Sequence, residues 1–319
     1  MPYQVVITDC PWSDISTEQS VLAEIGAEVR RFTCTQEEEV IAAARDADAL
    51  LVGWAPITNR VIRALARCRI IVRYGAGYNN VDVDAATEAG IGVAINAEYC
   101  VDEVATHALA LLLACHRQLM PLTHDVRRGV WDPMVTMKPM PRLSSQTVGI
   151  AGYGRIGRRL AALVRPLVQR VLVYDPAVAS TGDDSECRTW EDLLAESDYV
   201  SLHAPLTSST RHMIRQETLK FMKPSSYLIN CSRGPLVDES ALADALRTER
   251  LAGAALDVFE TEPLPAEHQF RQMPNVILTP HAAWFSRTAD YQLRSIPAGF
   301  VRDCLQGKAV PLLNAPARP

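Results

Sequence analysis

The sequence predicts an α/β protein made of two domains, each a parallel sheet wound with helices. Short apolar runs rich in Val and Ile alternate with helix-like segments, once before residue 100 and again after residue 146. The chain has 319 residues, of which 48% are hydrophobic, and this length favours two cores over one.

The first series of predicted strands lies before residue 100 and has five members. They are QVVIT (4–8), AEVRRF (27–32), ADALLVG (47–53), RIIVRYG (69–75) and IGVAIN (91–96). Helix-like segments lie between them at 17–25, 36–44 and 59–67. This alternation is typical of parallel βαβ units with helices on both faces of a sheet.

A long helical pattern, about 101–121, links this series to the second one. The second series of predicted strands comprises TVGIAG, RVLVYD, SDYVSLHA, SSYLINCS, LAGAALDVF and NVILTPH, and a last helical stretch covers roughly 287–305. We expect the chain to pass between domains on these two helical segments. The first domain is then discontinuous (1–100 and 286–319), and the second covers 101–285.

Composition argues against several other classes of protein. The net charge is −5, and the absence of a basic block makes direct nucleic-acid binding a poor hypothesis. The eight cysteines form no CxxC pair, so we expect free thiols and no metal site. The N-terminus lacks a signal-peptide pattern, and the longest apolar run, 108–115, is too short to cross a membrane. We therefore expect a soluble cytoplasmic protein.

The segment TVGIAGYGRIGRRLAALV (147–164) has the pattern of a dinucleotide-binding turn. Gly152 would allow the tight turn out of a strand, Gly154 the close approach of a pyrophosphate, and Gly157 close packing of the following helix. The helix N-terminus would offer N–H groups to the phosphates. Asp175 ends the next predicted strand, where it can bind ribose hydroxyls and repel a 2′-phosphate, which favours NAD over NADP.

Polar side chains follow three later strands, and their types suit hydride transfer between an alcohol and a ketone. Arg233 can hold a carboxylate through paired hydrogen bonds, and His281 can exchange the proton that accompanies the hydride. Asp257 and Glu262 follow another strand, where a carboxylate beside the histidine would stabilise its charged form. Cys231 also invites a reading as a nucleophile, but no His–Cys pair supports it.

Together these motifs resemble the D-isomer-specific 2-hydroxyacid dehydrogenase family from about residue 45 to 305. The resemblance rests on RYGAGYNNVD, VDEVATHALALLLA, GYGRIG…YDP, HAPLTSST, NCSRGPLVDE, ALDVFETEPLP and LTPHAAW. It implies a flavodoxin-like substrate (catalytic) domain, a Rossmann NAD-binding domain, a cleft between them and a homodimer. It implies that Arg233 binds the 2-oxo acid, His281 is the acid/base and Glu262 supports His281.

The resemblance also implies further contacts. The cofactor-binding residues it predicts are Thr106, Gly152, Gly154, Arg155, Ile156, Gly157, Asp175, His203, Ala204, Pro205, Thr210, Cys231, Ser232 and Asp257. The substrate-binding residues it predicts are Arg73, Ala76, Gly77, Arg233 and Trp284. Two departures from the family pattern, Ser145 in place of a common glycine and a helix end without glycine at VRPLVQ, lie away from the chemistry.

Within the family, HAAWFS and IIVRYGAGYNNVD look most like the branch of C-terminal-binding proteins and phosphoglycerate dehydrogenases. The leading hypothesis is an NAD-dependent enzyme that interconverts a D-2-hydroxy acid and a 2-oxo acid. One alternative is a corepressor-like protein that senses NAD(H) without turnover. Another is a variant that acts on phosphoglycerate, formate or a phosphorus oxyacid. The Met- and Pro-rich segment 131–143 is left open as part of the cleft or of a dimer contact.

Overall fold

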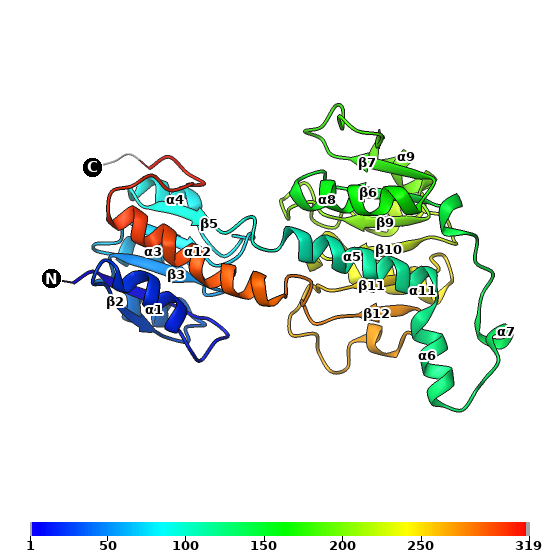
Figure 1. The fold of residues 1–319 in the computed structure, drawn as a ribbon, viewed down its shortest axis with the longest axis horizontal. Coiled ribbons are helices and arrows are strands. Elements are labelled where there is room, and N and C mark those ends of the chain that lie inside the picture. The colour runs from blue at the N-terminus through cyan, green and yellow to red at the C-terminus, as the bar shows by residue number, and fades with distance from the viewer. Residues whose placement is uncertain (1, 317–319) are drawn as a thin grey trace. The chain divides into compact units, whose positions relative to one another are not determined.

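The computed structural model describes residues 2–316 of the chain. The fold consists of two compact units (Figure 1). Unit 1 contains the residues up to Cys100 and those from Ser286 onward, and unit 2 runs from Val101 to Phe285. Each unit has its own parallel sheet, which confirms the predicted α/β fold class with two wound sheets.

Unit 1 contains a five-stranded parallel sheet in the order β2-β1-β3-β4-β5. Its strands are β1 (Gln4–Ile7), β2 (Glu28–Arg31), β3 (Ala49–Val52), β4 (Ile70–Arg73) and β5 (Gly92–Ile95). Its helices are α1 (Ser16–Ala23), α2 (Glu37–Ala44), α3 (Asn59–Ala64), α4 (Val83–Glu88) and α12 (Arg287–Leu305). Every residue of β3 is buried, because helices cover both faces of the sheet at its centre.

Unit 2 contains a seven-stranded parallel sheet in the order β12-β11-β10-β9-β6-β7-β8. Its strands are β6 (Thr147–Ala151), β7 (Arg170–Tyr174), β8 (Glu186–Cys187), β9 (Tyr199–Leu202), β10 (Tyr227–Asn230), β11 (Gly253–Leu256) and β12 (Val276–Leu278). Its α-helices are α5 (Val101–His116), α6 (Leu119–Arg127), α7 (Pro133–Thr136), α8 (Arg155–Val164), α9 (Trp190–Glu196), α10 (Gln216–Leu219) and α11 (Glu239–Arg247). Short 3-10 turns follow at η1 (Leu143–Ser145), η2 (Arg165–Leu167), η3 (Gly234–Leu236) and η4 (Gln269–Gln272).

Side-chain caps fix several helix starts in sequence. The side chain of Asp82 accepts a hydrogen bond from Ala85 N at 2.9 Å and begins α4. Ser286 accepts from Ala289 N at 3.0 Å and begins α12. These oxygens satisfy N–H groups that have no partner within the helix. The capped helix α12 covers the predicted stretch 287–305.

The helix predicted over 101–121 is interrupted, and this is a correction. Helix α5 ends at His116, and α6 begins at Leu119. Gln118 between them has a φ of 51°, in the left-handed region that ends a right-handed helix. Apolar spacing continues across the break, so periodicity alone does not reveal it.

All eight cysteines are free thiols, and only Cys187 and Cys304 are partly exposed. Burial raises the pKa of the Cys68 and Cys115 thiols to about 12. Such thiols are unreactive near neutral pH. No helix within residues 2–316 is both long and apolar enough to cross a membrane.

Candidate active site

The glycine turn after β6 is held by close backbone contacts. Gly152 has a φ of +95°, and a Cβ there would lie 2.6 Å from the backbone nitrogen of Ala204. A Cβ on Gly157 would collide with the carbonyl oxygen of Gly152. Both positions therefore require glycine, one for the turn and the other for packing of α8 on the turn.

Gly154 differs from these two glycines because its surroundings are open. A Cβ built at Gly154 meets no heavy atom within 4 Å. Gly154 is also the N-cap residue of α8 and, as a glycine, has no side chain with which to cap this helix end. The helix start is thus a cradle of backbone N–H groups suited to the phosphates of a dinucleotide.

Asp175 follows β7 directly and lies against the same turn. Its Oδ2 accepts a hydrogen bond from Tyr153 N at 2.7 Å, and its Oδ1 accepts from Ala177 N at 2.9 Å. An acidic side chain here suits the ribose hydroxyls of NAD and disfavours a 2′-phosphate. The open cradle and this carboxylate together fit a bound NAD.

The ends of β9 and β10 meet beside the glycine turn. Ser232 Oγ donates to the carbonyl of Ala204 at 2.8 Å, which ties the two loops together. Burial lowers the pKa of His203 to about 4, so its ring is neutral at pH 7. Within the described part of the chain, its buried Nδ1 has no hydrogen-bond partner, while Nε2 contacts Ser201 Oγ at 2.8 Å.

Two other predicted residues have local roles that the structure defines. Thr106 Oγ1 donates within α5, to the carbonyls of Asp102 at 2.8 Å and Glu103 at 3.0 Å. Cys231 is buried, and burial raises the pKa of its thiol far above neutral pH. A thiol that stays protonated is a poor nucleophile, which argues against the nucleophile reading.

Arg233 stands on a loop that packs tightly against the end of β11. Its Nη1 donates to the carbonyl of Ser232 at 2.6 Å, and Asn230 Nδ2 donates to the carbonyl of Arg233 at 2.9 Å. A Cβ on the next residue, Gly234, would collide with the backbone of Phe259. This close approach brings Arg233 near the loop that carries Glu262.

Glu262 and His281 are hydrogen-bonded directly. The imidazole Nδ1 of His281 lies 2.6 Å from Glu262 Oε2, and Phe259 N donates to Glu262 Oε1 at 2.9 Å. Burial raises the pKa of Glu262, but the hydrogen bond and positive charge of His281, together with Arg233, lower it below its ordinary value. The positive charge of Arg233 thus adds to the lowering of the pKa of Glu262.

Asp257 is fully buried at the end of β11, where its carboxylate holds the turn that carries His281. Oδ1 accepts from Thr279 Oγ1 at 2.6 Å and from Ala282 N at 2.9 Å, and Oδ2 accepts from Ala283 N at 3.0 Å. His107 Nε2 lies 3.1 Å from Thr279 Oγ1. The sequence analysis did not predict the contacts of His107 and Thr279 with this turn, although Thr279 lies two residues before His281.

The structure does not gather all predicted residues into one unit. Arg233, Glu262 and His281 belong to unit 2, as does Trp284, whose ring packs on Phe285 with centroids 5.5 Å apart. Arg73, at the end of β4 in unit 1, has its guanidinium carbon 6.0 Å from the centroid of the Trp54 ring. Ala76 and Gly77 follow on the loop after β4, partly exposed.

An open glycine cradle at a helix N-terminus and a hydrogen-bonded Glu–His pair beyond strand ends of the same sheet are typical of a dinucleotide-dependent oxidoreductase. Residues 109–283 match the family model described as D-isomer specific 2-hydroxyacid dehydrogenase, NAD binding domain. The chain belongs to the D-isomer specific 2-hydroxyacid dehydrogenase family. This confirms NAD as the cofactor and NAD-dependent oxidation of a CH–OH group as the class of reaction.

Relatives and solved structures support the assignment. A glyoxylate reductase of Korarchaeum cryptofilum is 39% identical over 274 residues, covering 83% of this chain and 81% of that protein. A D-3-phosphoglycerate dehydrogenase of Synechocystis sp. is 36% identical over 285 residues, covering 88% of this chain but 51% of that protein. This chain thus spans about half the length of that relative. A D-lactate dehydrogenase from Aquifex aeolicus, solved with NAD and lactic acid, is 27% identical with a TM-score of 0.83, covering 95% of this chain and 96% of the other.

Proposed function

We propose that the protein reduces a small 2-oxo acid to its D-2-hydroxy acid, and catalyses the reverse oxidation, with Arg233, Glu262 and His281 as catalytic residues. The observation that carries the proposal is the 2.6 Å contact between His281 Nδ1 and Glu262 Oε2. An imidazole fixed through Nδ1 presents its other nitrogen, Nε2, to a substrate.

Glu262 and His281 would manage the proton. With Nδ1–H donating to Glu262, Nε2 is the atom that hands a proton to the carbonyl oxygen in reduction and takes it back in oxidation. The carboxylate of Glu262 compensates the charge that the ring carries when both nitrogens are protonated. This division of labour is the usual one for a histidine oriented by a carboxylate.

Arg233 would bind the carboxylate of the acid and polarise the neighbouring carbonyl, since a guanidinium offers paired donors. We propose that Arg73, the backbone N–H groups of Ala76 and Gly77, and Trp284 add further substrate contacts. Support for Arg73 comes from its charge beside the exposed Trp54 ring.

Gly152, Gly154 and Gly157 would form the bed of the pyrophosphate, with N–H groups at Arg155 and Ile156, and Asp175 would bind ribose. Bound NADH supplies the hydride for C2 of the acid. We propose further cofactor contacts from Thr106, His203, Ala204, Pro205, Thr210, Cys231, Ser232 and Asp257. Asp257 would act mainly through backbone placement, since its carboxylate already accepts three hydrogen bonds.

As substrate we propose glyoxylate first and the oxidised form of 3-phosphoglycerate second. The relative at 39% identity is a glyoxylate reductase, and the relative at 36% identity is a D-3-phosphoglycerate dehydrogenase. Arg73 and Arg233 together could bind an acid that carries more than one negative charge. We also propose, from the motif HAAWFS that contains Trp284, that the chain falls in the branch of C-terminal-binding proteins and phosphoglycerate dehydrogenases. The protein would work in the cytoplasm, where its free thiols stay reduced.

Purified protein with NADH and a panel of 2-oxo acids tests this function through the loss of absorbance at about 340 nm, the reduced-nicotinamide band that hydride transfer abolishes. His281→Ala should lower kcat by roughly 100- to 10,000-fold, the usual contribution of an acid/base group, and leave the Kd of NADH nearly unchanged. NADH binding that drives dimerisation without turnover on any acid would favour the NAD-sensing alternative. Loss of NADH binding in His281→Ala would show that the role of His281 is misassigned.

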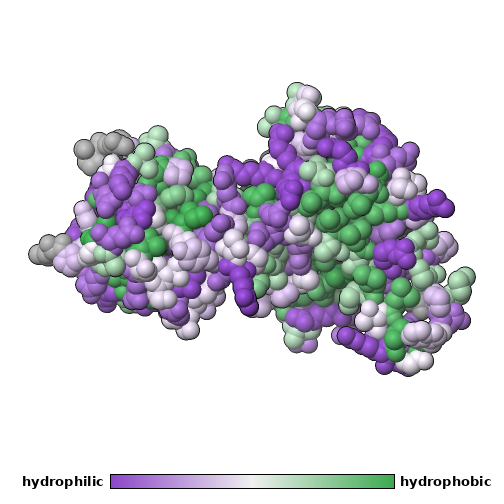
Figure 2. All heavy atoms as spheres, in the orientation of Figure 1, coloured by the Kyte–Doolittle hydropathy of each residue, from purple (hydrophilic) through white to green (hydrophobic). Residues whose placement is uncertain are grey.

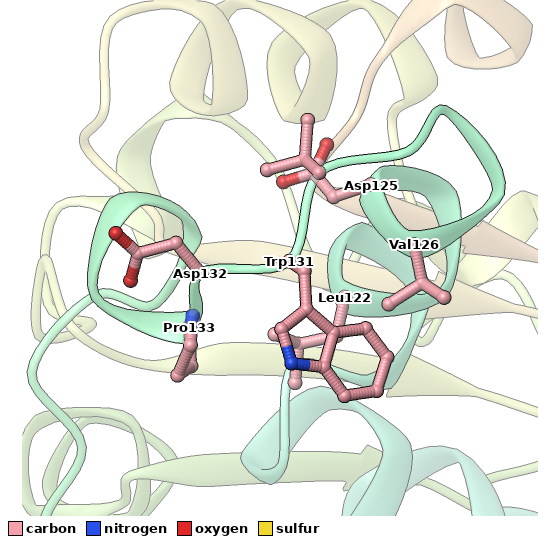
Figure 3. Close-up of a pocket in the computed structure, with 7 residues that line it drawn as sticks. Leu122, Asp125, Val126, Trp131, Asp132 and Pro133 are labelled. Carbon is pink, nitrogen blue, oxygen red and sulfur yellow. The ribbon is translucent and has the colours of Figure 1, made fainter.

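We further propose that the protein is a homodimer, joined through an apolar surface on unit 2. This surface consists of Leu119, Met120, Val126, Val130, Trp131 and Met134, all exposed, with Trp131 86% and Met134 85% accessible. Figure 2 shows hydrophobic residues gathered over α5 and toward α6 in unit 2. In Figure 3 the Trp131 ring lies beside Leu122 and Val126, at a pocket of about 290 Å³.

A second copy is the occupant that best fits this surface. Exposed aromatic and methionine side chains of this size are costly in water and mark interfaces. A larger groove of about 650 Å³ shares Met120 with this surface and is also lined by Pro121, Tyr227, Met273 and Ile277, among others. In a two-fold dimer this surface would pair with the same surface of the second copy.

Light scattering after size-exclusion chromatography tests the dimer. Wild type should have the mass of two chains, and the double variant Trp131→Glu/Met134→Glu the mass of one. Phe221→Glu, which changes an exposed apolar side chain outside the surface, is the matched control and should stay dimeric. Dimers that survive the double substitution would place the interface elsewhere.

A further inference from the structure

We propose that His107 is a positioning residue for the reaction, because it anchors the turn that carries His281 through Thr279 and Asp257. The inference rests on the proposed role of His281 and extends it to His107, a residue of α5 that has no role in the proposed function. His107 lies on α5, more than 170 positions before His281 in sequence, and its side chain is 25% exposed.

The hydrogen bonds of this chain have a defined direction. Thr279 has one O–H, and Asp257 Oδ1 lies 2.6 Å from its oxygen. A carboxylate only accepts, so Thr279 donates to Asp257. The oxygen of Thr279 is then the acceptor for His107 Nε2 at 3.1 Å, which fixes Nε2 as the protonated nitrogen of His107.

Asp257 in turn binds the backbone of residues 281–283, the turn that carries His281. Its two carboxylate oxygens accept from Ala282 N at 2.9 Å and Ala283 N at 3.0 Å, and its carbonyl accepts from His281 N at 2.8 Å. The carboxylate is completely buried, so each of these bonds lies out of water. The three residues 281–283 are therefore held from one side chain and one carbonyl.

The backbone of His281 explains why the turn needs such support. Its φ is 52°, in the left-handed region that a residue with a Cβ adopts only at a cost in energy. Strained backbone persists where surrounding contacts over-determine it. The hydrogen bonds that connect His107, Thr279 and Asp257 are such a set of contacts. They keep the imidazole of His281 within hydrogen-bonding distance of Glu262.

An alternative is that His107 only fills space between α5 and the end of β12. The two roles predict different behaviour for different substitutions. Glutamine carries an N–H donor near the position of Nε2 and preserves the hydrogen bond, whereas leucine has similar bulk and no donor. A space-filling role would tolerate leucine at least as well as glutamine.

The experiment compares His107→Gln and His107→Leu with wild type in two measurements. The first is amide hydrogen exchange of residues 281–283 in the cofactor-free protein. We expect leucine to speed this exchange by about 5-fold, the factor for one lost hydrogen bond, and glutamine to leave it near wild type. His124→Leu, which changes an exposed histidine on α6, is the matched control and should leave exchange at 281–283 unchanged.

The second measurement is steady-state kinetics with NADH and the best 2-oxo acid. His107→Leu should lower kcat by about 5- to 10-fold, because the imidazole loses its fixed position, with KM and the Kd of NADH within about 2-fold of wild type. His107→Gln should recover most of kcat. Equal kcat in wild type and leucine variant, or equal damage from glutamine and leucine, would overturn the proposal.

Substitution of Thr279 gives an independent test if the His107 variants fold poorly. Thr279→Ser keeps the hydroxyl and should behave like wild type, while Thr279→Val removes it and should speed exchange at 281–283. If Thr279→Val leaves amide exchange at residues 281–283 unchanged, the proposed hydrogen-bonded connection from His107 to the His281 turn is wrong. If wild type reduces no acid at all, the proposed function fails, while the exchange results still decide the role of His107.

Discussion

In each sheet the order in which successive strands are added reverses once, which leaves a crevice beside one strand. The crevice of unit 1 is filled by a side chain, whereas the crevice of unit 2 is open. In unit 1 the order β2-β1-β3 puts the change beside β1, where Asp9 lies after the strand end. The carboxylate of Asp9 accepts from Gly53 N at 3.0 Å, Trp54 N at 2.5 Å and Ala55 N at 3.2 Å. The protein thus fills this crevice with its own anion, held by its own N–H groups.

In unit 2 the order β9-β6-β7 puts the change beside β6. Here Gly152 packs on the backbone of Ala204, and the space at Gly154 stays open. Ligands of wound sheets bind at such places, outside the carboxyl ends of the strands. The comparison teaches that a crevice of this kind is closed where a side chain of the protein occupies it, as Asp9 does, and is free to receive the proposed phosphates where none does, as at Gly154.

The largest expected effect comes from partly filling the open crevice. Gly154→Ala has room for its methyl group, so the protein should fold, but the methyl stands where a pyrophosphate approaches the backbone. We expect the Kd of NADH, measured by fluorescence titration, to rise roughly 100-fold, the upper range for overpacking a tight contact. Gly299→Ala in α12 is the control and should bind NADH like wild type. Unchanged affinity in Gly154→Ala would remove the cradle from the cofactor site.

The second effect comes from removing the negative charge that occupies the crevice in unit 1. Asp9→Asn replaces an acceptor oxygen with an NH₂ group that faces backbone donors, and we expect unit 1 to lose about 1–3 kcal/mol of stability. Urea unfolding measures this loss, with Asp46→Asn, an exposed aspartate, as control. NADH affinity should not change, because the cradle lies in unit 2. An Asp9→Asn protein as stable as wild type would show that the three short N–H contacts are not a joint.

A third, smaller effect sharpens the ligand side of the comparison. Asp175→Ser removes the negative charge beside the ribose position and should raise the use of NADPH relative to NADH by roughly 10-fold, about 1.4 kcal/mol of relieved repulsion. The ratio of kcat/KM for the two cofactors measures it. A ratio that does not move would show that Asp175 serves only the turn through Tyr153 and Ala177.

The smallest effect concerns the acid side of the stability profile. The folded pKa of Glu262 lies below its ordinary value of 4.5, so its pairing with His281 stabilises the fold fully above about pH 4.5. That contribution disappears as the pH falls through the folded pKa. Calorimetry should therefore find wild type ahead of Glu262→Gln in Tm at neutral pH, with the gap closing in acid. A gap that is constant with pH would mean that the pair does not contribute through its charge.

Much of the fold could be predicted from sequence because each unit is built from local signals. Apolar runs of five to seven residues predicted the strands β1, β3, β4 and β6 to within one or two residues at each end. The glycine turn was legible because Gly152 and Gly157 meet steric demands that no other residue satisfies. Family membership followed from motifs that are each a short contiguous stretch of the sequence.

Other features left little trace in sequence, because they depend on one unusual backbone conformation or on contacts between distant segments. The break between α5 and α6 comes from the left-handed conformation of one residue, Gln118. The anchoring of the His281 turn joins His107 to Thr279, and a histidine on an apolar helix face looks like a packing residue until its partner is known. Asp9 was passed over for the same reason, since its three donors lie 44 to 46 residues further on.

The distribution of thiols has a practical consequence. Cys187 lies on the edge strand β8 of unit 2 and Cys304 near the end of α12 in unit 1, and both are partly exposed while the other six cysteines are buried. Maleimide dyes should therefore attach to one native position in each unit. Energy transfer between such a donor and acceptor would report, in a wild-type chain and on single molecules, whether NADH or an acid changes the separation of the two units.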